Sequence, residues 1–190
     1  MNASAEAVSL ARQRLWPAGA AAASVWAVLD LARDPRIYAL LLESRLEFLS
    51  LYSGRLPREL ERVSPHMVEL LPGHAFTARL IEQSLGMSWC VFMRIDDPTA
   101  LRPHLRKLLK VRAEDGRTLI FRWYDPRVLR AYLPTCRPDE QRAFFGPMTS
   151  MWAEGEGGRS LLEFRFDRRG FGTQTIPLAE EVTADADDPD

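Results

Sequence analysis

One short phrase occurs three times in the chain and constrains its fold more than any other feature. Each time, an apolar run rich in β-branched or aromatic residues ends close to an Asp-Pro pair, and a segment with helical spacing follows. The three pairs are Asp34-Pro35, Asp97-Pro98 and Asp125-Pro126. An aspartate before a helix accepts hydrogen bonds from free backbone N–H groups, and proline fits the first helical position. We therefore predict three strand–helix units, in which a capping aspartate such as Asp125 contributes about 1 kcal/mol.

The remaining apolar runs and turn residues complete the predicted architecture. The runs with β character are VWAVLDLA, LEFLSLYSG, SPHMVELL, SWCVFMRI and TLIFRWY. The segments with helical character are RIYALLLES, PRELERV, FTARLIEQSLG, TALRPHLRKLLK, RVLRAYLP and PDEQRAFFG. Asp115-Gly116 and the glycines between 155 and 158 each separate two β-like runs, which predicts two β-hairpins. The fold class that follows is α/β, a mixed sheet with helices packed on it.

Length and composition along the chain predict its organisation. A chain of 190 residues is most simply one domain. Residues 1–20 are expected to be a mobile or loosely docked N-terminal arm, although the alanines there could extend it as a helix. Residues 21–176 form the predicted α/β domain. Residues 177–190 are acidic, contain few large apolar side chains and are predicted to be disordered.

Net charge and cysteine content favour a cytoplasmic protein without a membrane segment. The formal net charge is −1, so no overall field attracts nucleic acid or anionic lipid. Two isolated cysteines fit a reducing compartment. Arg12 and Arg14 precede an apolar stretch, as in an export signal, but Glu6 and Pro17 are atypical of one. No apolar run approaches the roughly 20 residues that cross a membrane.

The sequence offers little that indicates catalysis. The three histidines are His66, His74 and His104, and none has a metal-ligand partner three or four positions away. No phosphate-binding glycine loop and no nucleophile elbow is present. Cys90 lies in an apolar run, which favours an inert buried thiol. We therefore expect no catalytic residues, no metal and no cofactor.

The segment 102–130 is basic and has two functional interpretations besides a solvated surface. Its cations are Arg102, Arg106, Lys107, Lys110, Arg112, Arg117, Arg122, Arg127 and Arg130. With Trp123 and Tyr124 nearby, the segment could bind nucleic acid as part of a regulatory protein. A protein partner with acidic features is the other interpretation. The arginine stems could equally lie over the core, with their charged heads in water.

Arg122 is the one member of this segment that helix capping does not explain. If TLIFRWY is a single strand, Leu119, Phe121 and Trp123 share a core face, and Arg122 lies mid-strand on the other face. A covered guanidinium needs a carboxylate, because an unpaired buried charge is very costly. The candidate carboxylates are Asp30, Asp97 and Asp125. Arg122 then forms either a structural ion pair or an anchor for a carboxylate of a partner.

The order of several sequence words resembles a known family. HLRKLLKVRAEDGRTLIFRWYDPRVLRAYLPTCRPDEQRAFFGPMTSMW, within Trp89–Arg165, is similar to the adaptor or chaperone domain of bacterial type VI secretion systems. VWAVLDLARDPRIYALL and SPHMVELL match the opening of that family, so the resemblance covers about residues 24–166. Its most specific words are FRWYDPRVL and FFGP.

The resemblance implies binding and not catalysis. Members are cytoplasmic, bind a secreted effector and bind the tail of the valine–glycine-repeat spike trimer (VgrG). Many carry a further helical lobe at the C-terminus, so this chain is expected to be a short form with one lobe. The matching positions are Arg106, Arg122, Tyr124, Asp125, Pro126, Arg127, Phe145 and Gly146. The candidate partner-binding residues among them are Arg106, Arg122, Tyr124, Asp125, Arg127 and Phe145.

Overall fold

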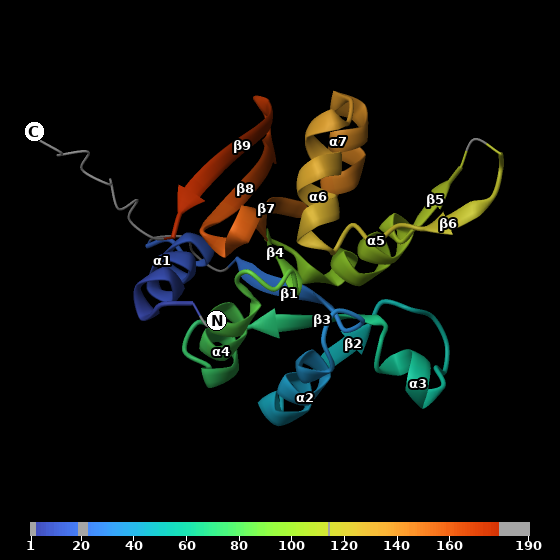
Figure 1. Ribbon diagram of the computed structural model, residues 1–190. Helices are drawn as coiled ribbons and strands as arrows, with labels where there is room; N and C mark the ends of the chain where they lie inside the picture. Colours follow the sequence, from blue (N-terminus) through green and yellow to red (C-terminus); the bar gives the residue numbers. More distant parts are fainter. Residues whose placement is uncertain (1–2, 19–22, 114, 179–190) are drawn as a thin grey trace, which may run out of the picture.

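The computed structural model describes residues 3–18, 23–113 and 115–178, and a seven-stranded sheet forms its centre (Figure 1). The strand order is β2-β3-β1-β4-β7-β8-β9, and every neighbouring pair is antiparallel. The strands are β1 (Ser24–Asp30), β2 (Phe48–Ser50), β3 (Pro65–Leu70), β4 (Cys90–Ile95), β7 (Met148–Glu154), β8 (Ser160–Asp167) and β9 (Gly170–Pro177). β1 is therefore an inner strand between β3 and β4.

Helices cover both faces of this sheet, which confirms the predicted α/β class (Figure 1). On one face lie α1 (Ala5–Leu15), α2 (Pro35–Ser44) and α4 (Ala75–Ser84). On the other lie α5 (Leu101–Leu108), α6 (Pro126–Tyr132) and α7 (Pro138–Phe145), while the short α3 (Arg58–Glu61) connects β2 to β3. Side chains of a strand alternate between faces, so Ala27 joins the first apolar cluster and Val28 the second. The result is three layers with two separate cores.

All three Asp-Pro pairs begin a helical segment, as predicted. The Asp34 carboxylate accepts from the backbone N–H of Arg36 at 2.8 Å, and α2 follows. Asp97 accepts from Thr99 at 2.9 Å and begins a single 3₁₀ turn (Pro98–Ala100) that leads into α5. Asp125 accepts from Arg127 at 3.0 Å at the start of α6. Each carboxylate thus satisfies a backbone donor that the helix itself leaves free.

Both predicted β-hairpins are present, but they differ in their surroundings. β7 and β8 pair within the main sheet, with the glycine-rich turn between them. β5 (Lys110–Arg112) and β6 (Thr118–Ile120) pair only with each other among the described residues, around the turn at Asp115-Gly116. Figure 1 shows this second hairpin projecting from the body of the protein beyond α5.

The prediction that TLIFRWY is one strand was wrong. β6 ends at Ile120, and the chain then turns, with the backbone N–H of Asp125 donating to the carbonyl of Arg122 at 3.0 Å. Leu119 is exposed on the hairpin whereas Trp123 is fully buried, so they share no core face. Alternation along a strand ends where the strand ends. Arg122 therefore lies in the turn before α6 and not in the middle of a strand.

The segment predicted to be a mobile or loosely docked arm contains α1, which packs into the core. The Ser4 hydroxyl caps α1 by accepting from the backbone N–H of Ala7 at 3.1 Å. Leu15, on the last turn, is fully buried against the sheet. Arg94 on β4 donates to the carbonyl oxygens of Arg14 and Leu15, at 3.0 and 2.8 Å. Apolar burial and a side-chain cap at its last turn therefore hold α1 in place.

The C-terminal part of the described chain extends the sheet further than predicted. β9 was not among the predicted strands, because its glycines and threonines lack an apolar run. The predicted acidic tail, 177–190, begins at the last residue of β9. Leu178 is buried, and its backbone N–H donates to the carbonyl of Arg159 at 2.8 Å. Residues 179–190 lie outside the described part of the chain. Within the described residues, no helix is long and apolar enough to span a membrane.

Candidate partner-binding site

The predicted site residues centre on an ion pair between the end of β1 and the turn before α6. Arg122 Nη2 donates to Asp30 Oδ2, which settles the choice among the three candidate carboxylates. The Asp30 side chain is 1% exposed, whereas that of Arg122 is 44% exposed. The other carboxylate oxygen of Asp30, Oδ1, is buried and has no side-chain hydrogen-bond partner among the described residues. A half-exposed guanidinium therefore compensates a fully buried charge.

Burial dominates the electrostatics of Asp30. It raises the pKa of the carboxyl above the ordinary value because the charged form loses its hydration. The hydrogen bond and positive charge of Arg122 oppose this shift, and the negative charge of Asp125 adds to it. The net effect is a raised pKa. Arg122 therefore lowers the free-energy cost of keeping the buried Asp30 carboxylate charged.

Asp125 is a second buried carboxylate, but its surroundings shift its pKa the other way. Burial alone would raise this pKa, yet the hydrogen bonds from Arg127, together with the charges of Arg127 and Arg33, lower it overall. Arg127 Nε and Nη2 each donate to one oxygen of Asp125, at 3.0 and 2.7 Å. This two-bond geometry is the one in which arginine binds carboxylates most strongly. Arg33, in the turn after β1, was not singled out in the sequence.

Three of the six candidate partner-binding residues lie in the core. Tyr124, Asp125 and Phe145 are each at most 3% exposed. The ring of Tyr124 contacts Trp123 edge to face at 5.9 Å, and burial raises its pKa. Phe145 packs between Phe166 and Phe171, at 5.8 and 6.3 Å between ring centroids. A partner that binds the folded protein cannot reach these side chains.

The glycine of the FFGP word also has a packing explanation. Gly146 has a φ of +50°, which favours glycine. A Cβ at this position would overlap the ring of His104, whose Nε2 lies 2.8 Å from the carbonyl oxygen of Phe144. His104 and Gly146 therefore fit each other where α7 ends beside α5. Close packing against His104 therefore explains the glycine of this motif without a ligand contact.

The other three candidate partner-binding residues are arginines that solvent can reach. Each of them has one internal hydrogen-bond partner. The side chains of Arg122 and Arg127 are 44% and 49% exposed, and Arg106 donates to the hydroxyl of Ser53 in the loop after β2. That loop also brings Tyr52 against Tyr124. A guanidinium has five N–H donors, and the protein itself uses only some of them here. The site can therefore donate hydrogen bonds to carboxylate or carbonyl oxygens of a partner.

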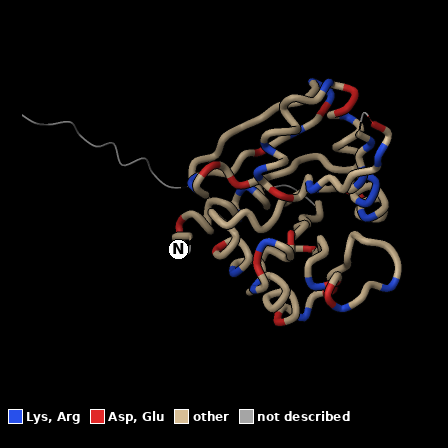
Figure 2. Tube along the Cα trace, turned by 45° about the vertical axis from the view of Figure 1, so that its right-hand side comes forward, with Lys and Arg blue, Asp and Glu red and all other residues tan. Residues whose placement is uncertain are grey.

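Most cations of the basic segment 102–130 are already bound within the protein. Six of the nine have internal partners: Arg102 with Ser50, Arg106 with Ser53, Arg117 with Asp115, Arg122 with Asp30, Arg127 with Asp125 and Arg130 with Glu154. Figure 2 shows acidic and basic stretches interspersed along the chain instead of one continuous basic face. Phosphate binding relies on several cations along one surface, and the interspersed acidic residues interrupt such a surface here.

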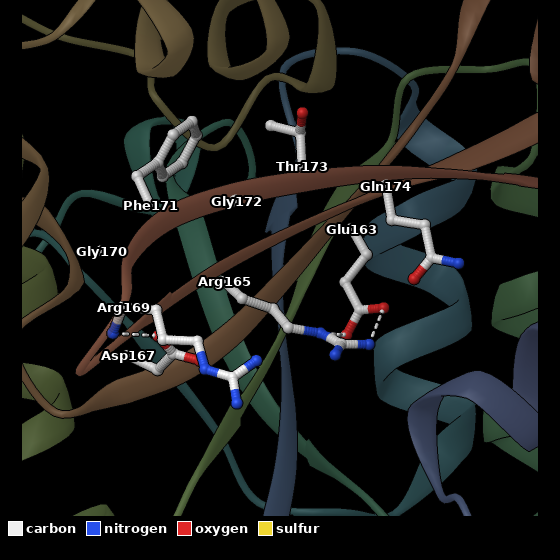
Figure 3. A pocket seen from close by; sticks show the side chains of 9 residues that line it. All are labelled: Glu163, Arg165, Asp167, Arg169, Gly170, Phe171, Gly172, Thr173 and Gln174. Carbon is white, nitrogen blue, oxygen red and sulfur yellow. Dashed lines mark hydrogen bonds and ion pairs between the residues drawn. The ribbon is translucent and has the colours of Figure 1, made fainter.

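Two further groups of polar residues occur among the described residues, on β8 and β9 and around Glu154 on β7. A shallow polar cavity of about 270 Å³ lies on β8 and β9, where Arg165 donates two hydrogen bonds of 2.7 Å to Glu163 (Figure 3). Glu154, which the sequence did not single out, is buried and accepts from the backbone N–H of Gly86 and from the hydroxyl of Ser88. No group of three potential metal ligands occurs within the part of the chain that is described.

The only reactive side chain considered from the sequence is shielded. Cys90 is buried in the first apolar cluster, and burial raises the pKa of its thiol. A buried thiol with a raised pKa stays protonated at neutral pH and is a poor nucleophile.

Comparison with known proteins gives one family match. A family model described as a domain of unknown function (DUF4123) matches residues 25–143, which is more than half of the chain. The matched residues include all three Asp-Pro pairs and both members of the Asp30–Arg122 pair. No curated protein and no solved structure matches this chain.

Proposed function

We propose a function for this chain from one premise: it belongs to the DUF4123 family. In this proposal the protein is a cytoplasmic adaptor that binds a secreted effector and helps to load it onto the VgrG spike of a type VI secretion system. The sequence words that resemble such adaptors lie within the family match or directly after it. FRWYDPRVL occupies 121–129, inside the matched residues, and FFGP occupies 144–147. The proposal includes no catalytic step.

One observation carries the proposal beyond the resemblance. In the most specific word, the buried residues build a joint between β1 and α6, while the two arginines leave half of each side chain in solvent. Guanidiniums fixed at one end lose less conformational freedom when they bind a second partner. The joint is thus suited to protein recognition through carboxylate or carbonyl groups.

A nucleic-acid-binding regulator is the second candidate function. The basic segment 102–130 motivates it, but only Lys107, Lys110 and Arg112 have no partner described above. Binding to DNA or RNA through several phosphates would fall steeply with increasing salt. A titration of the purified protein with duplex DNA and with single-stranded RNA at several salt concentrations distinguishes this candidate from the adaptor.

The adaptor proposal predicts a stable complex with proteins encoded nearby. The tagged chain is co-expressed with the VgrG and the effector encoded beside its own gene, and complexes are separated by size-exclusion chromatography. We expect co-elution with the effector, with VgrG or with both. A VgrG and an effector from an unrelated gene cluster serve as controls. Failure to bind either neighbouring protein contradicts the proposal.

The same assay tests the role of the joint. Arg122→Ala is compared with Arg79→Ala, because Arg79 is also half-exposed and pairs with a carboxylate, Glu43, in the opposite helical layer. A folded Arg122→Ala protein that no longer binds, beside an Arg79→Ala protein that does, assigns Arg122 to the interface. Binding by both folded variants shows that Arg122 is structural.

A further inference from the structure

The β5–β6 hairpin is an unusual element for a small domain. Two strands of three residues each are too short to be stable in water on their own. The hydrogen bonding between the two arms continues past the strands, because the backbone N–H of Phe121 donates to the carbonyl of Leu109 at 2.8 Å. The ring of Phe121 also contacts Tyr132 on α6, with centroids 4.7 Å apart. Beyond this base, the hairpin projects away from the rest of the protein (Figure 1).

Large apolar side chains are exposed on this hairpin and next to it. Ile120 is 63% exposed, the highest value for a large apolar side chain among the described residues. Leu119, its neighbour, is 44% exposed, and Tyr132, at the base of the hairpin, is 37% exposed. Leu119 and Ile120 are consecutive strand residues and therefore lie on opposite faces of the hairpin, so each face carries one exposed large apolar side chain.

The strand register places cations around Ile120. Lys110 lies directly opposite Ile120, and Arg112 lies opposite Thr118. Directly opposite residues share one face of a hairpin, so Lys110, Arg112 and Ile120 form one surface, which we call the basic hairpin face. No carboxylate among the described residues forms an ion pair with Lys110, Arg112 or the nearby Lys107.

The local charge differs in sign from that of the whole chain. Residues 106–122 contain six Lys or Arg residues against Glu114 and Asp115, whereas the formal net charge of the chain is −1. Two cations that have no ion-pair partner among the described residues, beside an exposed isoleucine, suit a partner with carboxylates and an apolar side chain. Phosphate contacts would leave the isoleucine unused, which favours a protein partner over nucleic acid.

We infer that the basic hairpin face is the docking surface for an acidic, extended segment of the effector. In this arrangement carboxylates of the segment contact Lys110 and Arg112, and an apolar side chain of the segment covers Ile120. The hairpin also offers unpaired strand edges among the described residues, along which an extended segment can add as a further strand. The inference rests on the proposed adaptor function and specifies the chemistry of its partner.

The test uses the full-length protein and the effector encoded beside its gene. Lys110→Glu/Arg112→Glu reverses both charges of the basic hairpin face. Arg58→Glu/Arg62→Glu is the matched control, because these two arginines are exposed at the first residue of α3 and directly after its last residue. We expect effector affinity to fall at least about tenfold in the hairpin variant and to change less than about twofold in the control. We also expect wild-type affinity to decrease with salt, as for exposed charge pairs.

A second variant separates the apolar contribution from the charged one. Ile120→Ser keeps both cations and removes the exposed side chain, so effector affinity should fall by a similar factor at low and high salt. Because Ile120 lies outside both buried clusters, the thermal midpoint of this variant should match that of the wild type. Ile120→Ser therefore still tests the basic hairpin face if the charge-reversal variant does not fold.

The possible outcomes distinguish the inference from the proposed function. If the wild type binds the effector and the folded hairpin variants bind equally well, the inference is wrong and the adaptor function stands. If the wild type binds neither effector nor VgrG, both are wrong. Binding of DNA or RNA that the charge reversal abolishes, with effector binding unchanged, also overturns the inference.

Discussion

Asp30 and Arg122 are 92 residues apart in the chain, yet the positive charge of the guanidinium compensates the negative charge of the buried carboxylate. Removing the arginine leaves a buried carboxylate with neither of its oxygens paired to a side chain. We expect Arg122→Ala to lower the free energy of unfolding by about 2 kcal/mol, since an unsatisfied buried group costs about 1–3 kcal/mol. Solvent screens the half-exposed arginine, so a loss at the upper limit for a fully buried ion pair is not expected.

Urea denaturation of single and double variants measures this loss. Asp30→Asn removes the buried charge, so Arg122→Ala should cost much less in that background. The loss should also shrink as the pH falls into the acid range, because the raised pKa of Asp30 makes this carboxyl neutral at a higher pH than an ordinary aspartate. An equal loss at all pH values and in both backgrounds would contradict the pairing.

At this scale, the sequence predicted that Arg122 could pair with a carboxylate, but for a reason that the structure does not bear out. The expected buried charge was the Arg122 guanidinium in mid-strand, whereas the buried charge is that of Asp30 and Arg122 is half-exposed. The choice of Asp30 over Asp97 and Asp125 depends on where β1 ends in space. The Asp125 carboxylate already accepts a hydrogen bond from Arg127, two residues away, and the Asp97 carboxylate accepts one from the backbone N–H of Thr99. No local pattern contains that information.

Among the elements, α1 shows how a weakly predicted segment becomes part of the core. Arg94 contacts the last carbonyls of α1, and its guanidinium lies 4.9 Å from the ring centroid of Trp152. We expect Arg94→Ala to speed amide hydrogen exchange in α1 by about fivefold, because one helix cap is worth about 1 kcal/mol. Amides of α6, on the opposite face, are the internal control and should be unchanged. Equal acceleration in both helices would show that the variant acts globally.

Elements set by local chemistry were predicted well, and elements set by packing were not. The Asp-Pro helix starts and both hairpin turns follow from backbone hydrogen bonding within a few residues. TLIFRWY has strand composition throughout, but its last residues turn into the core because Trp123 packs against Phe144 on α7. β9 has little strand signal, yet it pairs with β8 over its whole length. Both differences come from contacts between distant segments.

For the whole molecule, stability should depend on pH through His66. This side chain is buried on β3 beside Phe48, and its Nδ1 lies 3.0 Å from the carbonyl oxygen of Ser64. Burial lowers its pKa, so the folded protein holds the ring neutral where the unfolded chain, with a pKa near 6.5, binds a proton. The free energy of unfolding should therefore be highest above about pH 6.5 and decrease as the pH falls toward the lower folded value.

Thermal or urea denaturation between pH 7.5 and pH 5, values set around the ordinary histidine pKa of about 6.5, measures this dependence. His66→Phe keeps a ring against Phe48 and cannot titrate, so its stability should vary less over this range. A variant with the same pH slope as the wild type would assign the dependence to other groups.

The position of Asp30 on β1 has a consequence for how the chain assembles during synthesis. β1 precedes the other described strands in the sequence, and its sheet neighbours β3 and β4 are complete by residue 95. Arg122 follows only later, so those strands can pair before the charge at the end of β1 is compensated. While that charge is unpaired, hydration of Asp30 favours an open end of the sheet. Arrival of Arg122 removes this penalty as α6 docks, so completion of the second helical layer stabilises the first half of the sheet.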